Sequence, residues 1–491
     1  MQQSLKKSEG VMLYSNQKGC DGDRFYYSGK AAVIVNGTVA VQASQSSLND
    51  VELATATINL TQVRCYRDDV GRPNGKISKG PTYKRIKVDL ERFKSNSGIN
   101  GNVCSFTHPL LRTHSPEREL VLDPACWLWD MLRSSRAAGF LCPLGDGIDS
   151  CSTATLVYGM CRVVMTVIGE GNKQVIADVQ RIVRYLEAGE GWLPSTPEEL
   201  CNYILHTMYM GVTAHSSVET RSRAQRLADS IGAYHFDMDI DELFTAQRNL
   251  LGRFANYEPK FSIYCNKAEN FALHNIQAHG RMVTTYCFAQ RLPRIRQRQG
   301  SGGLLVLGSV NLEECLRGNV TKHDCSSADL NVTGGTSNLD IRRFSRWAQT
   351  AFSLPIFDEF PDAPPTSELE PRRSYRVESD EKDMGMTYEE IFVMAKLRKE
   401  ERMGPVTMFE RLLVDWHDRK SPQETAVLVK RFHHFYAINR YKMTIMTSSY
   451  HAADYSAEDP RPFLYPEFQD SWACKRIDSI LTFQRVKGRE A

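Results

Sequence analysis

The sequence predicts an α/β protein with a doubly wound parallel sheet and a smaller β-rich segment before it. An apolar run at 140–144 leads through a glycine turn into a helical pattern that includes Ala154 and Val164. Further along, short apolar runs alternate with helical patterns, which is typical of a parallel sheet that binds ligands at the carboxyl ends of its strands. Near the start, Asn36 and Gly37 separate two short β-like runs, which is a strong hairpin signal.

Length and composition are those of an ordinary globular chain. The 491 residues are enough for two or three domains, with 42% hydrophobic and 24% charged residues. A formal net charge of +3 favours neither nucleic acid nor a membrane surface as a partner. No secretory signal is evident, no apolar run reaches membrane-spanning length, and the 13 cysteines show no paired spacing. We therefore expect a cytoplasmic protein with reduced thiols and without a nucleic-acid or membrane partner.

The first part of the chain is expected to be β structure, over residues 11–64. Residues 50–60 extend this pattern, because apolar and polar side chains alternate there. Residues 65–118 are polar with scattered Gly, Pro, Lys and Arg, and we interpret them as a linker with loops. The two runs of the predicted hairpin are 31–35 and 38–41.

Helix and strand patterns alternate after this linker. Asp123 and Pro124 provide an N-cap and a first-turn proline for a helix that Gly139 is expected to end. A basic loop follows a long helix, and a solvated surface is the interpretation of its four arginines, Arg291, Arg294, Arg296 and Arg298. The remaining predicted strands are 204–210, 233–238 and 304–307, and the predicted helices are 217–231, 271–292, 388–401 and 423–439.

The turn after the 140–144 run has the composition of an anion-binding site. Gly145 and Gly147 lie between the predicted strand and helix, an arrangement that aims backbone N–H groups and a helix N-terminus at an anion such as phosphate. Asp149 and Ser150 begin the predicted helix, where a carboxylate caps N–H groups or binds a cation. The spacing matches neither a P-loop nor a dinucleotide-binding motif, so a purely structural turn stays an alternative.

A second polar segment, residues 308–335, follows the predicted strand 304–307. It offers one lysine, Lys322, among carboxylates and hydroxyls. Zinc binding is not expected, because the segment contains no Cys-x-x-Cys pair. Asp149 and Glu314 are instead a candidate magnesium pair, because Mg²⁺ prefers oxygen ligands that it shares with phosphates.

The stretch 139–161 resembles the Ser-Gly-Gly-x-Asp-Ser pyrophosphate loop of the N-type ATP pyrophosphatases. Among these it is most similar to the glutamine-dependent NAD synthetase family in its eukaryotic form, and the similarity extends from about residue 16 to residue 465. Gly145 stands at the serine position of the loop and Asp146 at its first glycine position, and the resemblance makes both positions catalytic. The ATP-binding loop that it implies consists of Pro143, Leu144, Gly145, Asp146, Gly147, Ile148, Asp149 and Ser150.

The resemblance also assigns residues of the later segments. The ATP contacts that it implies outside the loop are Ser309 and Thr366, the Mg²⁺ ligands are Asp149 and Glu314, and the deamido-NAD contacts are Lys322, Asp329, His279 and Lys442. Three of the later positions depart from the family pattern. His279 replaces an arginine of the deamido-NAD site, Asn338 replaces an ATP-binding lysine, and Tyr441 replaces a histidine.

The reaction that the resemblance implies is the amidation of deamido-NAD. ATP activates the nicotinate carboxylate as an adenylate and releases pyrophosphate, and an amine nitrogen then displaces AMP. Residues 1–64 resemble the end of a nitrilase-type glutaminase domain whose Glu, Lys and Cys have no counterparts here, and Cys20 does not match that nucleophile. We therefore expect free ammonia as the nitrogen donor. The expected domains are 1–64 (glutaminase remnant), 65–118 (linker and loops), 119–465 (synthetase) and 466–491 (C-terminal tail), with a homo-oligomer through the synthetase domain.

Two alternative functions stay open at this point. The five departures favour a non-catalytic descendant that binds a nucleotide or a partner protein. Asp146 is the most adverse of them, because two like charges about 4 Å apart repel by roughly 4 kcal/mol at an effective dielectric near 20. A ligase similar to GMP synthetase is the other alternative, and the composition of residues 308–335 argues against it.

Overall fold

A computed structural model describes most of the chain, which divides into two units. The first unit comprises residues 1–19 and 27–115, and the second comprises residues 20–26 and 116–491. Each unit is described by itself below. The residues that the structure describes are 10–70, 112–145, 147–183, 191–214, 216–261, 267–298, 302–360, 381, 384–443, 447, 449–450 and 471–490.

The first unit contains the predicted hairpin. β4 (Ala32–Val35) pairs antiparallel with β5 (Thr38–Gln42), and β1 (Val11–Tyr14) pairs with the other edge of β4. Asn36 and Gly37 have φ angles of 48° and 79°, the left-handed values that a tight two-residue turn requires. The hairpin prediction is therefore confirmed.

The strand predicted upstream of α2 (Leu60–Val70) is wrong, because residues 51–59 have no regular structure. Asn59 Oδ1 accepts a hydrogen bond from the backbone N–H of Thr61 (2.9 Å), and Val63 is buried against the sheet. Capping and the burial of one helical face therefore outweigh the alternating pattern. The helix also occupies the first residues of the predicted linker. A short ladder of β2 (Lys18–Cys20) and β3 (Tyr26–Ser28) completes the amino-terminal strands.

The second unit is built on a parallel sheet. Its strands are β6 (Phe140–Pro143), β7 (Leu205–Gly211), β8 (Tyr234–Asp239), β9 (Leu305–Gly308) and β10 (Leu330–Asn331). They run parallel in the order β10-β9-β6-β7-β8. The chain therefore starts in the middle of the sheet at β6, builds outward on one side, and then returns to build the other side. This is the order of a doubly wound sheet, so the predicted fold class is confirmed.

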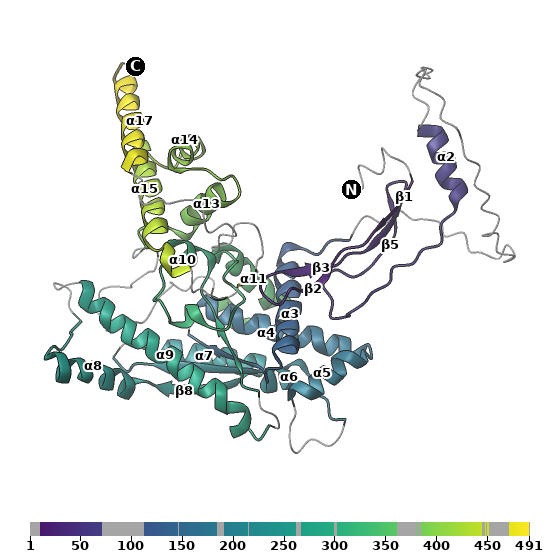
Figure 1. Cartoon of the computed structure of the whole chain (residues 1–491), viewed down its shortest axis with the longest axis horizontal. Coiled ribbons are helices and arrows are strands. Elements are labelled where there is room, and N and C mark those ends of the chain that lie inside the picture. The colour runs from purple at the N-terminus through teal and green to yellow at the C-terminus, as the bar shows by residue number, and fades with distance from the viewer. Residues whose placement is uncertain are drawn as a thin grey trace. The chain divides into compact units, whose positions relative to one another are not determined.

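Helices cover both faces of this sheet (Figure 1). α4 (Ile148–Gly169) contacts β6, β7 and β9, and α3 (Pro116–Ser135) and α7 (Val218–Ile231) pack against it. α9 (Lys267–Ile295) also contacts β6 and β9, and α8 (Asp241–Ala255) lies against α9. Because crossovers between parallel strands are right-handed, the reversal of strand order places α9 on the face opposite α4. Its apolar side chains share a core with Leu141, Met208 and Val306.

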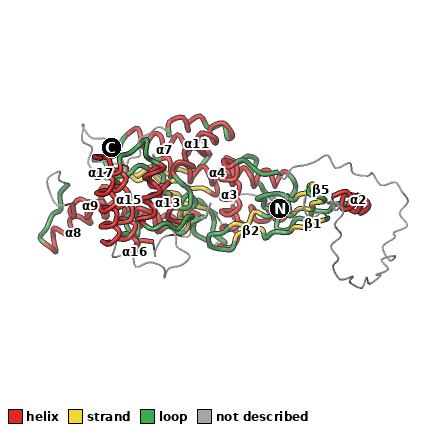
Figure 2. The backbone as a smooth tube through the Cα atoms, turned by 90° about the horizontal axis from the view of Figure 1, so that it is seen from above, coloured by secondary structure: helices red, strands yellow, loops and turns green. Residues whose placement is uncertain are grey.

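A group of carboxyl-terminal helices has an apolar core of its own. α13 (Tyr388–Lys399), α15 (Pro422–Ile438) and α17 (Ser471–Glu490) lie side by side in Figures 1 and 2, and α14 (Pro405–Asp415) packs against all three. The two helices predicted here are confirmed. Buried side chains such as Ile477 show that residues 471–490 are an integral part of this group.

α3 begins earlier than predicted. It starts at Pro116, and Pro124, the predicted first helical position, lies inside it. Glu117 and Glu119 in the first turn favour a helix N-terminus at this point, and Val121 is buried. These contributions offset the backbone hydrogen bond that an internal proline removes.

Gly139 has a different role from the predicted helix stop. α3 already ends at Ser135, and Gly139 has a φ of 143° at the start of β6. A Cβ atom at this position would lie 2.3 Å from the carbonyl oxygen of Ile204, the last residue of α6 (Pro197–Ile204). Glycine is therefore required by the close approach of two backbones.

One helix of the described part, α4, is long and apolar enough to cross a membrane, so the prediction that no run has this length was wrong. However, 72% of its most apolar window is buried inside the protein. The apolar length of α4 is explained by its contacts with the sheet on one side and with α3 on the other.

The four arginines near the end of α9 are not all on a solvated surface, which corrects the prediction. Arg291 and Arg294 are exposed as expected. Arg296, in contrast, lies 4.0 Å from the ring centre of Tyr234. Arg298 is only 5% exposed. The side chains of Arg296 and Arg298 therefore pack against other parts of the protein instead of extending into solvent.

Candidate functional site

The carboxyl ends of β6 and β9 lie next to each other where the strand order of the sheet reverses. From β6 the chain turns into α4, and from β9 it turns into α10 (Leu312–Arg317). In open α/β sheets, ligands bind at this switch point. Asn311 joins the two segments, because its Nδ2 donates a hydrogen bond to Asp149 Oδ1 (3.3 Å).

The glycine turn after β6 is closed by Ser150. The backbone N–H of Gly145 donates to Ser150 Oγ (3.2 Å), and this hydroxyl in turn donates to the carbonyl oxygen of Gly147 (3.2 Å). Gly147 is the N-cap of α4 and has no side chain to cap the first turn, and a Cβ built on it would meet no described residue within 4 Å. The N-terminus of a 22-residue helix thus adjoins open space, as an anion site requires. Asp146 lies outside the described residues.

The two candidate metal ligands are held by one asparagine. Asn311 and Glu314 form a capping box, in which Glu314 N–H donates to Asn311 Oδ1 (3.0 Å) and Asn311 N–H donates to Glu314 Oε2 (3.3 Å). The hydroxyl of Tyr388 donates to the other carboxylate oxygen, Glu314 Oε1 (3.4 Å). Asp149 and Glu314, which are 165 positions apart in the sequence, therefore share Asn311 as a partner.

These carboxylates fit a magnesium ion but not a closed protein cage. Within the described residues, no group of three or more His, Cys, Asp or Glu could hold a metal ion. Mg²⁺ typically takes one or two carboxylates and completes its coordination with water and substrate phosphates. Asp149 and Glu314 beside a helix N-terminus are a donor set of this kind.

Glu313 is a second carboxyl group behind this site. It is fully buried, and burial raises its pKa to about 8, although the backbone N–H of Asn338 donates to Oε2 (2.9 Å). Within the described residues, neither Glu313 Oε1 nor Asn338 Nδ2 has a hydrogen-bond partner. The resemblance expects a lysine at the position of Asn338. Because the side chain of Asn338 is neutral, it gives the carboxyl group of Glu313 no positive charge as a partner.

Lys322 lies in a turn that is held from two sides. His279 Nε2, on α9, is 2.7 Å from the backbone oxygen of Lys322. Lys442 Nζ donates to two backbone carbonyls of the 318–320 turn, at 2.8 and 2.7 Å, and burial lowers its pKa. The ammonium group of Lys322 lies 5.4 Å from the ring centre of Tyr441. His279 therefore contacts the backbone of Lys322, Tyr441 lies beside its ammonium group, and Lys442 holds the turn that precedes it.

The other predicted residues of this segment have fewer contacts. Asp329 Oδ1 accepts a hydrogen bond from the Tyr286 hydroxyl (3.0 Å), and Oδ2 accepts one from Val306 N–H (2.8 Å). Ser309 is half-buried and forms no hydrogen bond with the described part of the chain. Thr366 lies outside the described residues.

Sequence reasoning missed three residues of this site. Asn311 had a readable signal, because Asn followed by Glu three positions later is a capping-box pattern, and that signal went unused. Glu313 and Tyr286 had no such sequence signal. Glu313 is notable because it is buried, and Tyr286 because its hydroxyl donates to Asp329, and neither feature can be seen in the sequence.

Comparison with known proteins gives consistent matches. The family model described as NAD synthase matches residues 121–412. Glutamine-dependent NAD(+) synthetases of Saccharomyces cerevisiae and Homo sapiens are 47% and 45% identical, over 97% and 94% of this chain and 67% and 64% of their own length. The crystal structure of a glutamine-dependent NAD(+) synthetase from Cytophaga hutchinsonii is similar in fold, with a TM-score of 0.68 at 19% identity, over 97% of this chain and 67% of that chain.

Proposed function

Because this chain belongs to the glutamine-dependent NAD(+) synthetase family of ligases, we propose that it converts deamido-NAD to NAD with ATP and ammonia. One observation carries the proposal. Asn311 brings Asp149, in the first turn of α4, to the Glu314 cap at the switch point of the sheet. Carboxylates that can bind a cation thus lie beside a helix N-terminus that can bind an anion. This is the arrangement that a nucleoside triphosphate and its metal ion require.

The proposed reaction consists of two balanced steps. A nicotinate carboxylate oxygen attacks the α-phosphorus of ATP, and pyrophosphate leaves. Ammonia then adds to the acyl carbon and loses a proton, and AMP leaves with the former carboxylate oxygen. A carboxylate oxygen is a poor leaving group until it is adenylated, so placing charge around pyrophosphate is the main task of the protein.

The amino-terminal turn of α4 is proposed to bind the pyrophosphate. Its backbone N–H groups and the helix dipole provide positive potential. The Ser150 hydroxyl keeps the Gly145 turn closed and so fixes where these N–H groups point. Asp149 and Glu314 would hold Mg²⁺, which neutralises charge on the phosphates when it is bound.

Deamido-NAD is proposed to bind on the α9 side of the site. Lys322 provides the cation, and its turn is fixed by His279 and Lys442. Lys442 thus acts by positioning in this proposal, because its ammonium group already donates to backbone carbonyls. Asp329 offers carboxylate oxygens beside Tyr286.

Ammonia is the proposed nitrogen donor for this chain. Use of glutamine would require a thiolate nucleophile, and Cys20 is the cysteine of the glutaminase-like residues 1–64. Burial raises the pKa of Cys20 to about 11, with a further contribution from the nearby carboxylates of Asp21 and Asp130. At neutral pH it is therefore a thiol, which is a poor nucleophile. A cytoplasmic location and a homo-oligomer stay predictions.

The test is to incubate the full chain with ATP, Mg²⁺ and deamido-NAD, with either ammonium or glutamine, and to measure NAD and AMP. We expect both products from ammonium alone. Asp149→Asn should lower the rate about 100-fold or more, because one metal ligand is lost. Asp418→Asn is the matched control, because Asp418 is 83% exposed, and its rate should not change.

Two results would contradict the proposal. NAD formed from glutamine would show that a nucleophile other than Cys20 is present. No NAD from either donor, in folded protein that still binds ATP, would favour the non-catalytic alternative. The observation behind that alternative is that Lys442, one of the expected cations, is bound to backbone carbonyls.

A further inference from the structure

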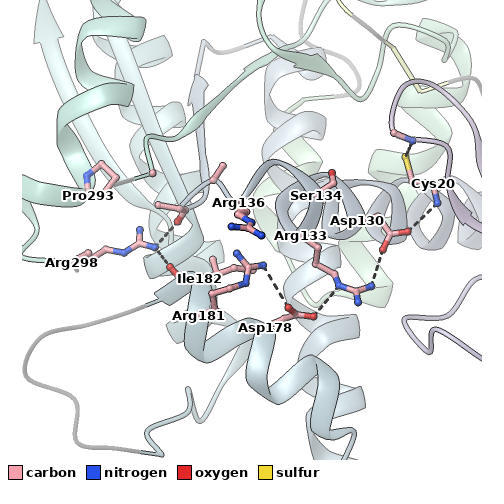
Figure 3. Close-up of a pocket in the computed structure, with 14 residues that line it drawn as sticks. Cys20, Asp130, Arg133, Ser134, Arg136, Asp178, Arg181, Ile182, Pro293 and Arg298 are labelled. Atoms are coloured by element: carbon pink, nitrogen blue, oxygen red, sulfur yellow. Dashed lines mark hydrogen bonds and ion pairs between the residues drawn. The ribbon is translucent and has the colours of Figure 1, made fainter. Parts of the chain in front are cut away.

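A second pocket lies at the opposite end of β6 from the candidate site. It has a volume of about 830 Å³ and is formed by α3 and the segment after it, α5 (Lys173–Val183), the end of α9 and the turn between β2 and β3 (Figure 3). This volume is in the range of small-molecule sites. Its charged lining residues are Arg133, Arg136, Arg181, Arg298, Asp130 and Asp178.

Arg298 is a buried cation in the wall of this pocket. Its guanidinium donates to the backbone carbonyls of Val183, Tyr203, Ala138 and Ile182, and it is paired with no carboxylate of the described chain. Burial, together with the charge of nearby Arg296, lowers the pKa of Arg298 to about 10. The hydrogen bonds of this group are satisfied by the protein, but its charge is not.

The other charges of the pocket leave an excess of guanidinium groups. Arg133 and Arg181 share Asp178, with N–O distances of 2.9 and 3.5 Å, and Arg133 also contacts Asp130 (3.4 Å). Arg136 forms no hydrogen bond or ion pair within the described residues, and it has a left-handed φ of 58°. In Figure 3 its guanidinium points into the space between α3 and α5. Four guanidinium groups thus face two carboxylates.

We propose that this pocket binds a small phosphate-bearing molecule, at a site separate from the carboxyl edge of the sheet. The excess of two positive charges matches a phosphate monoester, which carries between about −1.5 and −2 at pH 7. Guanidinium groups bind phosphate oxygens through two parallel hydrogen bonds. Arg136, which has no competing partner, and Arg181 are the contacts, and Arg298 provides the fixed charge behind them. The proposal does not depend on the synthetase reaction.

The experiment is calorimetric titration of the full chain with phenyl phosphate, at fixed ionic strength, with citrate as a carboxylate probe. Arg136→Gln should weaken phenyl phosphate binding to the pocket roughly tenfold, the loss expected for one charge-assisted hydrogen bond. Arg136→Lys, which keeps the charge, should recover part of the affinity. Arg343→Gln is the matched control, because Arg343 is 69% exposed on α11 (Asn338–Ala351) and pairs only with Asp340 in the described structure.

Binding at the N-terminus of α4 contributes equally in all of these variants, so their difference isolates the pocket. Because the exposed side chain of Arg136 forms no hydrogen bond or ion pair with the described chain, its replacement should leave folding and NAD formation unchanged. Equal affinity of the wild type, Arg136→Gln and Arg343→Gln for phenyl phosphate would overturn the proposal. Tighter binding of citrate than of phenyl phosphate, lost in Arg136→Gln, would overturn the assignment of phosphate.

Discussion

The two ends of β6 carry opposite chemistry and are built in different ways. At the carboxyl end, carboxylates and hydroxyls are arranged by short-range contacts, such as the Asn311–Glu314 capping box and the closed turn at 145–150. At the amino end, Arg133 of α3 and Arg181 of α5 share Asp178, and the buried Arg298 after α9 lines the same pocket. Local turns and caps thus shape the parts of the first site, which the contact between Asn311 and Asp149 joins, whereas the second site has no such local parts.

The difference also concerns how charge is compensated. Among the described residues, Glu313 at the carboxyl end is buried without a cation, and Arg298 at the amino end is buried without an anion. Buried unpaired charges are unfavourable unless hydrogen bonds or a change in protonation compensate them. Arg298 relies on four carbonyls, whereas Glu313 has one N–H donor and a raised pKa. Replacing Arg298 and Glu313 in turn should therefore distinguish compensation by hydrogen bonds from compensation by a change in protonation.

The largest expected effect is at the amino end. Arg298→Met should lower the free energy of unfolding by about 5 kcal/mol, because four buried carbonyl groups lose their donor. Urea unfolding followed by circular dichroism measures this change. Arg343→Met serves as the control and should stay within about 0.5 kcal/mol of the wild type. A loss below about 1 kcal/mol at Arg298 would show that other donors replace the guanidinium.

At the carboxyl end, the expected signature is a pH dependence. The pKa of Glu313 is about 8 in the folded chain against an ordinary value of 4.5. As pH rises from 4.5 to 8, the unfolded chain releases this proton while the folded chain keeps it, so the wild type loses stability over this range. Glu313→Gln cannot titrate and should keep about 3 kcal/mol more of its stability than the wild type between pH 5 and pH 8.

Urea unfolding at pH 5, 6.5 and 8 tests this prediction. Glu410→Gln is a suitable control, because Glu410 is an exposed carboxyl group on α14 of the carboxyl-terminal helices. Parallel pH profiles for the wild type and Glu313→Gln would mean that Glu313 is charged in the folded state and has a counter-ion.

The same contrast explains what the sequence could predict. The doubly wound parallel sheet, the Asn36 hairpin and the glycine turn follow from local patterns, and the structure confirms the first two. The helix start at Asp123 and the strand over 50–60 were wrong, because burial of Val121 and of Val63 outweighed the local signals. The arginine pocket had no sequence signal, since its four arginines come from three separate segments, near residues 133–136, 181 and 298.

Gly145 provides a gain-of-function test at the carboxyl end. A Cβ atom at this position would be 3.7 Å from Ser150 Oγ, an ordinary contact, so Gly145→Ser should fit without strain. If the added hydroxyl bonds to a phosphate oxygen, kcat/KM for ATP should rise roughly tenfold. Gly169→Ser, at the far end of α4, also meets open space and should leave the rate unchanged. A lower rate in Gly145→Ser would show that the space is needed by the substrate.

The smallest expected effect concerns Tyr441. Its ring lies 5.4 Å from the ammonium group of Lys322, and a cation–π contact at a partly exposed site contributes about 0.5–1 kcal/mol. Tyr441→Leu should therefore raise KM for deamido-NAD about threefold and leave kcat nearly unchanged, because the ring orients a binding group and touches no reacting atom. Tyr441→Phe keeps the ring and should behave like the wild type. A fall in kcat in Tyr441→Leu would contradict a role in binding alone, and a loss in Tyr441→Phe as large as in Tyr441→Leu would show that the hydroxyl itself contacts the substrate.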